Sequence, residues 1–152
     1  MLLDTGDALV GGGVLGDTTH GEAVVAGMNL MGYDALALGP LELSLGPDVL
    51  RERMAEAACP LLSGNVVLTG TEELVARPYT VLEVGGRRVG VLGLTRPSHE
   101  PLAGFQVLDP LTAANEYVPE LAEKSDAVVV LTNLGYRAGL ELANAVPGID
   151  LL

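Results

Sequence analysis

The chain has 152 residues, of which 49% are hydrophobic and 18% are charged, a composition typical of a globular protein with a large core. It contains 20 Asp and Glu but only eight Lys and Arg, which gives a net charge of −12. This charge repels nucleic-acid backbones and anionic lipids, and no apolar run is long enough to span a bilayer. We therefore expect neither nucleic acid nor a membrane as a partner.

Apolar runs and amphipathic segments alternate along the chain. The apolar runs predict strands at 1–3, 35–38, 61–67, 79–84, 89–94, 127–135 and 149–152. The amphipathic segments predict helices at 20–32, after Pro47, at 109–124 with a kink or early end at Pro119, and around 137–145. A turn at Gly85-Gly86 makes a hairpin of two of the strands. This order predicts a single α/β domain over 1–152, with layers of helix and mixed sheet.

The segment GGGVLG at 11–16 satisfies the G-x-G-x-x-G pattern of dinucleotide-binding loops. Three polar residues separate it from the next helix, however, and Asp34 precedes its strand instead of ending it. We therefore interpret this segment as a mobile glycine loop. Thr19 and Glu22, three residues apart, predict a capping box at the start of the first helix.

Side chains common in metal sites and nucleophilic sites are scarce. His20 and His99 are the only histidines, and neither is spaced with another candidate as metal ligands usually are. We expect both to be exposed to solvent. Cys59 is the only cysteine and precedes an apolar run, so we expect a buried thiol and no internal disulfide.

The segment LDTGDALVGG at 3–12 is the most informative stretch for chemistry. An apolar strand places Asp4 and Asp7 at its carboxyl end, where α/β proteins carry their sites. Carboxylates in this place could hold a divalent cation. Alternatively they satisfy backbone donors of the turn, which this stretch alone favours.

Longer phrases of the sequence follow one another in a familiar order. They are LLDTGDAL, GEAVVAGMNLMGYDALALG, CPLLSGNVV, PYTVLEVGGRRVGVLGLT and DAVVVLTNLG followed by ELANAVPGIDLL. Together they resemble the metallophosphoesterase (calcineurin-like) domain of the 5'-nucleotidase and UDP-sugar hydrolase family, nearly from end to end. The resemblance implies a layered α/β/β/α sandwich with mixed sheets, incomplete at both ends of this chain.

The same resemblance implies a two-metal phosphoesterase site that this chain does not reproduce. In the family an aspartate of a Gly-Asp motif bridges two divalent ions, and a metal-bound hydroxide attacks phosphorus. Gly6-Asp7 matches that motif, so Asp7 is the one expected metal-ligand position. Pro40-Leu41 stand where the family has Asn-His, and Asn133 stands where it has a further histidine. The family's Asp-x-His strand would precede Met1, and its Gly-His-x-His motif would follow Leu152.

These departures predict a degenerate, non-catalytic domain that serves as a scaffold or interaction module, with no catalytic residue and no cofactor. The alternative is a metal-dependent phosphoester or nucleotide hydrolase with a reduced or subunit-shared site. It would use manganese or zinc held by Asp4, Asp7 and Glu42, with further ligands from a partner chain. A third possibility is a small-ligand binding module built on the 11–16 loop and the loop at Gly39.

An incomplete sheet would expose strand edges and apolar surface. We therefore expect a homo-oligomer, or association with another chain through these edges. The sequence opens without the basic and apolar regions of a signal peptide, which favours the cytoplasm, although the resembled family is often extracytoplasmic.

Overall fold

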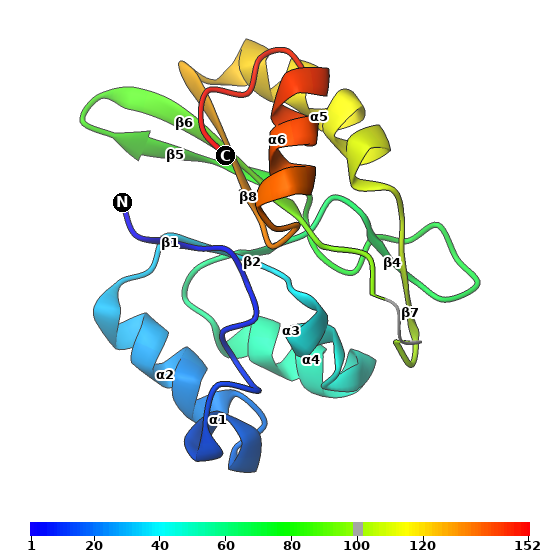
Figure 1. Cartoon of the computed structure of the whole chain (residues 1–152). Helices are drawn as coiled ribbons and strands as arrows, with labels where there is room; N and C mark the ends of the chain where they lie inside the picture. Colours follow the sequence, from blue (N-terminus) through cyan, green and yellow to red (C-terminus); the bar gives the residue numbers. More distant parts are fainter. Residues whose placement is uncertain (99–101) are drawn as a thin grey trace.

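The computed structural model describes residues 1–98 and 102–152, so the loop position expected for His99 lies outside the described residues. Figure 1 shows the elements in chain order. The strands are β1 Leu3–Asp4, β2 Ala35–Ala37, β3 Leu61–Leu62, β4 Val66–Leu68, β5 Tyr79–Val84, β6 Arg87–Leu94, β7 Phe105–Val107 and β8 Ala127–Thr132. The helices are α1 Val14–Thr18, α2 Glu22–Met31, α3 Pro40–Leu43, α4 Gly46–Glu56, α5 Pro110–Lys124 and α6 Tyr136–Ala145.

The strands form two main sheets and one small one. The first sheet has the order β1-β2-β3, with both pairs parallel. The second has the order β5-β6-β8, in which the β5–β6 hairpin is antiparallel and the β6–β8 pair is parallel. Strands β4 and β7 pair antiparallel in a small sheet of their own. The predicted mixed pairing is therefore confirmed.

The two main sheets pack face to face, and helices cover their outer faces (Figure 1). Strand β2 illustrates the arrangement, because Ala35 and Ala37 face the second sheet while Leu36 lies in the cluster that contains the α2 and α4 side chains. Strand β8 alternates in the same way, with Val129 toward the first sheet and Val130 toward α5 and α6. The result is the four-layered α/β/β/α sandwich that the family resemblance implied.

A glycine in β6 lets the sheets approach closely. A Cβ atom on Gly93 would lie 2.5 Å from the Leu62 carbonyl oxygen and 2.6 Å from Leu62 Cβ. The first of these atoms belongs to the backbone of β3, so a side chain at this position would push the two sheets apart.

Several local expectations were wrong. The strand expected at 61–67 is split at 63–65 between β3 and β4, which lie in different sheets. The expected 149–152 strand is reduced to one bridge between Leu151 and Val129. The early end expected at Pro119 does not occur, because helix α5 continues to Lys124 with buried side chains on both sides of the proline packed on the second sheet. The expected glycine loop is partly helical, since α1 begins at Val14.

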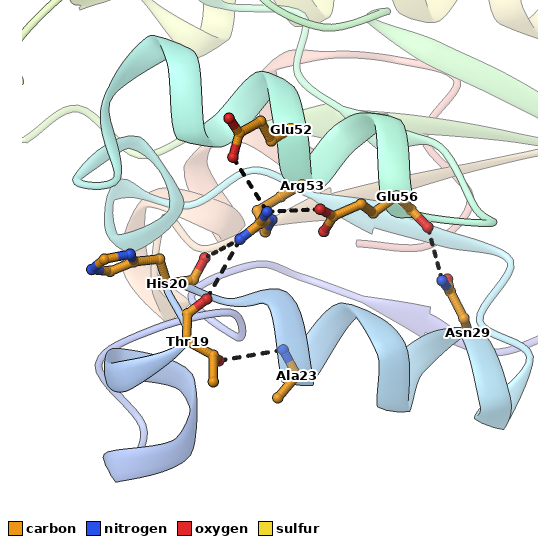
Figure 2. Close-up of polar contacts among 7 residues, drawn as sticks. All are labelled: Thr19, His20, Ala23, Asn29, Glu52, Arg53 and Glu56. Carbon is orange, nitrogen blue, oxygen red and sulfur yellow. Dashed lines mark hydrogen bonds and ion pairs between the residues drawn. The ribbon is translucent and has the colours of Figure 1, made fainter.

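The turn between α1 and α2 is held by a buried arginine instead of the expected capping box. Gly21 is the N-cap of α2, and Thr19 Oγ1 accepts a bond from the Ala23 amide at 3.3 Å. Figure 2 shows Arg53 of α4 donating to the carbonyl oxygens of Thr19 and His20 at 3.4 and 3.2 Å, and to Glu56 at 2.7 Å. The imidazole of His20 is exposed, as expected, but the residue lies before the helix with a φ of 48°.

Helix α5 begins with a side-chain cap that the sequence predicted correctly. Asp109 Oδ2 accepts bonds from Thr112 N at 2.8 Å and Thr112 Oγ1 at 2.7 Å. These bonds lower the pKa of the Asp109 carboxyl. Replacing Asp109 with alanine should cost about 1 kcal/mol of stability at neutral pH, as measured by urea unfolding.

The contribution of this cap should depend on pH in a defined direction. When folding lowers the pKa of a carboxyl, the carboxylate stabilises the folded chain fully at a pH above its pKa in the unfolded chain. This stabilisation is lost as the pH falls through its pKa in the folded chain. The difference in the free energy of unfolding between the wild type and Asp109→Ala should therefore become smaller at acidic pH. Asp109→Asn accepts the same bonds without titrating and serves as the control. If Asp109→Ala lowered the free energy of unfolding by the same amount at neutral and at acidic pH, this assignment would be contradicted.

No helix within residues 1–98 and 102–152 combines the length and apolar character needed to cross a bilayer.

Candidate functional site

The loops that follow β1, β2 and β8 meet around Gly39. A Cβ atom on Gly39 would overlap Asp7 Oδ1 and would lie 2.6 Å from Asn133 Nδ2. The same loops approach at Gly6, where a Cβ atom would lie 2.7 Å from the Gly39 nitrogen. The structure therefore brings together Asp7, Asn133 and the segment at Gly39, which the sequence singled out separately.

Asp7 is held by the backbone of the next loop. It is half-buried with a φ of 60°, and its Oδ1 accepts a bond from the Leu41 amide at 2.9 Å. The isobutyl group of Leu41 leans over Gly11, where a Cβ atom would lie 2.7 Å from Leu41 Cδ1. Asp7 thus anchors the turn of α3, and the side chain next to it is apolar.

Glu42 has a role that the sequence did not predict. Its carboxylate is fully buried and accepts four backbone bonds, from the amides of Asp7, Ala8, Leu9 and Gly39, at 2.8 to 2.9 Å. Burial raises the pKa of this carboxyl, and the amide donors offset part of that rise. Both oxygens face protein donors, so Glu42 joins the loop after β1 to α3 and is not directed toward a ligand.

Asn133 presents a donor to this site. Its Oδ1 accepts a bond from the Arg96 amide at 2.8 Å, which fixes the orientation of the side chain. Its Nδ2 is buried beside Gly39 and finds no hydrogen-bond partner among the described residues. An amide NH2 group has no lone pair for a metal ion, so Asn133 in this orientation does not replace a histidine ligand.

A second polar cluster lies nearby and was also missed from the sequence. Thr95 is completely buried, and its backbone and side chain bond to Asn65 and to the hydroxyl of Ser63. Thr95 Oγ1 also donates to the Leu38 carbonyl at 2.7 Å. The only signal in the sequence is that Ser63 and Asn65 interrupt an apolar run. These bonds fasten together the loops after β2, β3 and β6.

The donor set does not fit a pair of divalent ions. Within residues 1–98 and 102–152, no group of three or more His, Cys, Asp or Glu side chains is arranged to hold a metal. Asp4 Oδ1 accepts a bond from the Gly6 amide at 2.9 Å, as the turn interpretation predicts, and Glu42 is committed to four amides. Asp7 Oδ1 likewise accepts one backbone bond, so Asp4 and Asp7 are the remaining carboxylates, and two carboxylates cannot supply two coordination spheres.

A cavity of about 530 Å³ opens beside this site. Its described lining contains no Lys, Arg, His, Asp or Glu; it consists of Thr5, Thr132, Gly135, Tyr136, Gly139, Leu140, Ala143 and Leu152. Phosphate groups in proteins are usually bound by cationic side chains, metal ions or helix N-termini, and this lining supplies no cationic side chain. The lining therefore does not favour phosphate.

No protein-family model matches the chain. Protein UshA of Yersinia enterocolitica is 32% identical over 162 residues, a match that covers 99% of this chain and 29% of UshA. The trifunctional nucleotide phosphoesterase protein YfkN of Bacillus subtilis is 28% identical over 191 residues, covering 100% of this chain and 13% of YfkN. The chain thus spans less than a third of the length of these curated relatives.

Solved structures agree with the sequence matches. The 5'-nucleotidase precursor from Thermus thermophilus has a TM-score of 0.87 and 34% identity, covering 98% of this chain and 31% of the precursor. The calcineurin-like phosphoesterase YfkN from Bacillus subtilis has a TM-score of 0.81 and 27% identity, covering 99% of this chain and 56% of that one. By sequence and by fold, nearly the whole chain is similar to part of the 5'-nucleotidases and calcineurin-like phosphoesterases.

Proposed function

We propose that this chain is a non-catalytic member of its family that acts as a scaffold or interaction module. One observation carries the proposal. Beside Asp7, Leu41 and Asn133 occupy positions where the resembled family has histidines, and they present an isobutyl group and a hydrogen-bond-donating amide. Leu41 offers only its backbone amide to Asp7, and Asn133 points its NH2 group toward Gly39. Neither contributes a metal ligand beside Asp7.

Charge supports the same proposal. The chain has a net charge of −12, which disfavours an anionic substrate unless metal ions or arginines offset it locally. The adjoining cavity has no cationic side chain in its described lining. A phosphoester would therefore meet an acidic molecule without the groups that usually stabilise it.

The proposal is tested by assaying the purified chain with manganese or zinc on nucleoside monophosphates and on an aryl phosphate. We expect no turnover above that of the metal alone, and we expect Asp7→Ala to give the same result as the wild type. Asp150→Ala, which alters a carboxylate on the C-terminal segment, is the matched control. Metal-dependent turnover that disappears in Asp7→Ala but persists in Asp150→Ala would overturn the proposal.

The hydrolase alternative predicts a different result in the same assay. It requires Asp4, Asp7 and Glu42 to share one metal site with ligands from a second chain. Because both oxygens of Glu42 accept backbone bonds, the ligands available from one chain reduce to Asp4 and Asp7, each of which already accepts one backbone bond. Divalent metal retained by the assembled protein after gel filtration, measured by elemental analysis, would favour the alternative.

An interaction module needs a surface that other chains can bind. We propose association through exposed strand edges, as the open sheets predict. Within the described residues, β1 in the first sheet and β5 in the second pair on one side only, whereas β3 and β8 each form one further bridge, to Arg77 and Leu151.

A further inference from the structure

The segment that contains α1 is hydrogen-bonded mainly within itself. We call residues 11–21 the strap. Asp17 Oδ1 accepts a bond from the Gly11 amide at 2.6 Å, and further backbone bonds run from one strap residue to another. Apart from the adjoining helix α2, the guanidinium of Arg53 is the only group among the described residues that bonds to the strap. The strap is therefore a compact unit that one polar side chain links to the helix layer.

The strap contributes little to the core. Figure 1 shows α1 at the edge of the molecule, beside α2. Gly16 and Gly21 are the buried residues of the strap, whereas Val14 and Leu15 are exposed. A Cβ atom on Gly16 would lie 2.6 Å from the Leu9 carbonyl oxygen, so this contact is close but involves no side chain of the strap. Segments that bury few apolar side chains are those that open locally at a low free energy.

Arg53 of α4 holds the strap through weak bonds. It is 6% exposed, and Figure 2 shows its guanidinium between α4 and the turn that precedes α2. It donates to the carbonyl oxygens of Thr19 and His20 at 3.4 and 3.2 Å, which are long distances, and to Glu56 of its own helix at 2.7 Å. Its Nε is buried without a hydrogen-bond partner among the described residues. When the strap moves away, Arg53 keeps Glu56 and gains water, so the free energy that holds the strap closed is modest.

Glycines stand at both ends of the strap. Residues 11–13 are three glycines before α1, and Gly21, with a φ of 83°, precedes α2. A Cβ atom on the second or third glycine of 11–13 would have no neighbour within 4 Å, so packing does not fix the chain there. A cavity of about 380 Å³ separates part of the strap from Leu9 and Val24. Such glycine positions can absorb the changes in φ and ψ that a rotation of the strap requires.

We propose that the strap opens as one unit while the rest of the chain stays folded, turning about the glycines at its two ends, and that Arg53 is the latch that closes it. Opening uncovers Leu9, whose side chain is completely buried. Leu9 belongs to the loop that begins at Asp7 and is held by Glu42. The strap thus covers one side of the loop that carries Asp7, and its opening gives solvent access to that side. The inference does not depend on the non-catalytic role proposed above.

Hydrogen exchange of the full chain, followed by NMR at single amides, tests the opening. The amides of Asp17, Thr19 and Gly21 donate within the strap. We expect these amides to share one opening equilibrium and, after correction for intrinsic rates, to exchange at least about a hundredfold faster than the amides of β6. Strap amides that exchange only as fast as those of β6 would overturn the proposal.

Substitution of the latch tests the role of Arg53. Arg53→Met keeps an apolar stem of similar length but removes the bonds to the strap. Relative to the amides of β6, the strap amides should exchange at least about fivefold faster in this variant. Arg51→Met is the matched control, because Arg51 lies on the same helix and pairs with Asp48 at the surface. A general loss of stability speeds exchange in β6 and in the strap alike, so it does not imitate loss of the latch.

Substitution of the glycines should act in the opposite direction. The double variant Gly12→Ala, Gly13→Ala restricts the backbone of the open strap, and in the closed strap the added methyl groups meet no neighbour within 4 Å. Exchange of the strap amides should therefore slow by at least about twofold. An effect of Arg53→Met no larger than that of Arg51→Met, or alanines that leave the exchange rates of the strap unchanged, would overturn the proposal.

Discussion

Replacing Glu42 with glutamine is expected to lower the free energy of unfolding by about 2 to 4 kcal/mol, although the two side chains have almost the same shape. The carboxylate accepts four amides and is inaccessible to solvent. Glutamine has one acceptor oxygen and one NH2 group, so half of these amides would face another donor. Urea or guanidinium unfolding followed by circular dichroism measures the loss.

Glu72→Gln is the matched control for this substitution. Glu72 is exposed, so the same chemical change there should alter stability by less than about 0.5 kcal/mol. A loss in Glu42→Gln no larger than in the control would contradict the assignment of Glu42 as the connection between the first loop and α3.

The second large effect is expected from Gly93→Ala, which should destabilise the chain by about 1 to 3 kcal/mol. The added methyl group would lie 2.5 Å from the Leu62 carbonyl oxygen, in the backbone of the facing sheet. A backbone atom cannot rotate away as a side chain does, so the sheets must separate and lose contacts along their interface. Thermal unfolding by calorimetry measures the result.

Gly27→Ala is the control of opposite sign. Gly27 lies inside α2, and a Cβ atom there would have no neighbour within 4 Å. Alanine should therefore stabilise the helix by about 0.5 to 1 kcal/mol. If both glycine substitutions changed stability in the same direction, the close sheet contact at Gly93 would not be the cause of the first.

The sequence was sufficient to predict the layers because their pattern is local. The run at 35–38 alternates small and large apolar residues, and the structure places Ala35 toward the facing sheet and Leu36 toward the helices. The helix end expected at Pro119 was wrong because tertiary packing outweighs the local effect of the proline. Val118 and Leu121 are completely buried, and their packing keeps α5 helical beyond Pro119. The break at 63–65, where the chain passes from one sheet to another, also depends on tertiary structure and could not be predicted from the local pattern.

The candidate site was predicted only in part. The positions that the family resemblance singled out, Gly6-Asp7, 40–41 and 133, lie close together around Gly39. The role of Glu42 was not predictable, because three of its four donors belong to a loop more than 30 residues earlier in the chain. The orientation of Asn133 likewise depends on the Arg96 amide, 37 residues away.

Titration calorimetry with manganese and with zinc tests whether this chain holds a pair of divalent ions. We expect no heat of specific binding to the wild-type chain. The double variant Leu41→His, Asn133→His places two imidazoles around Asp7 and should bind zinc, because three convergent ligands suffice for this ion. Binding of two divalent ions per wild-type chain, abolished by Asp7→Ala, would contradict the proposal that the chain is non-catalytic.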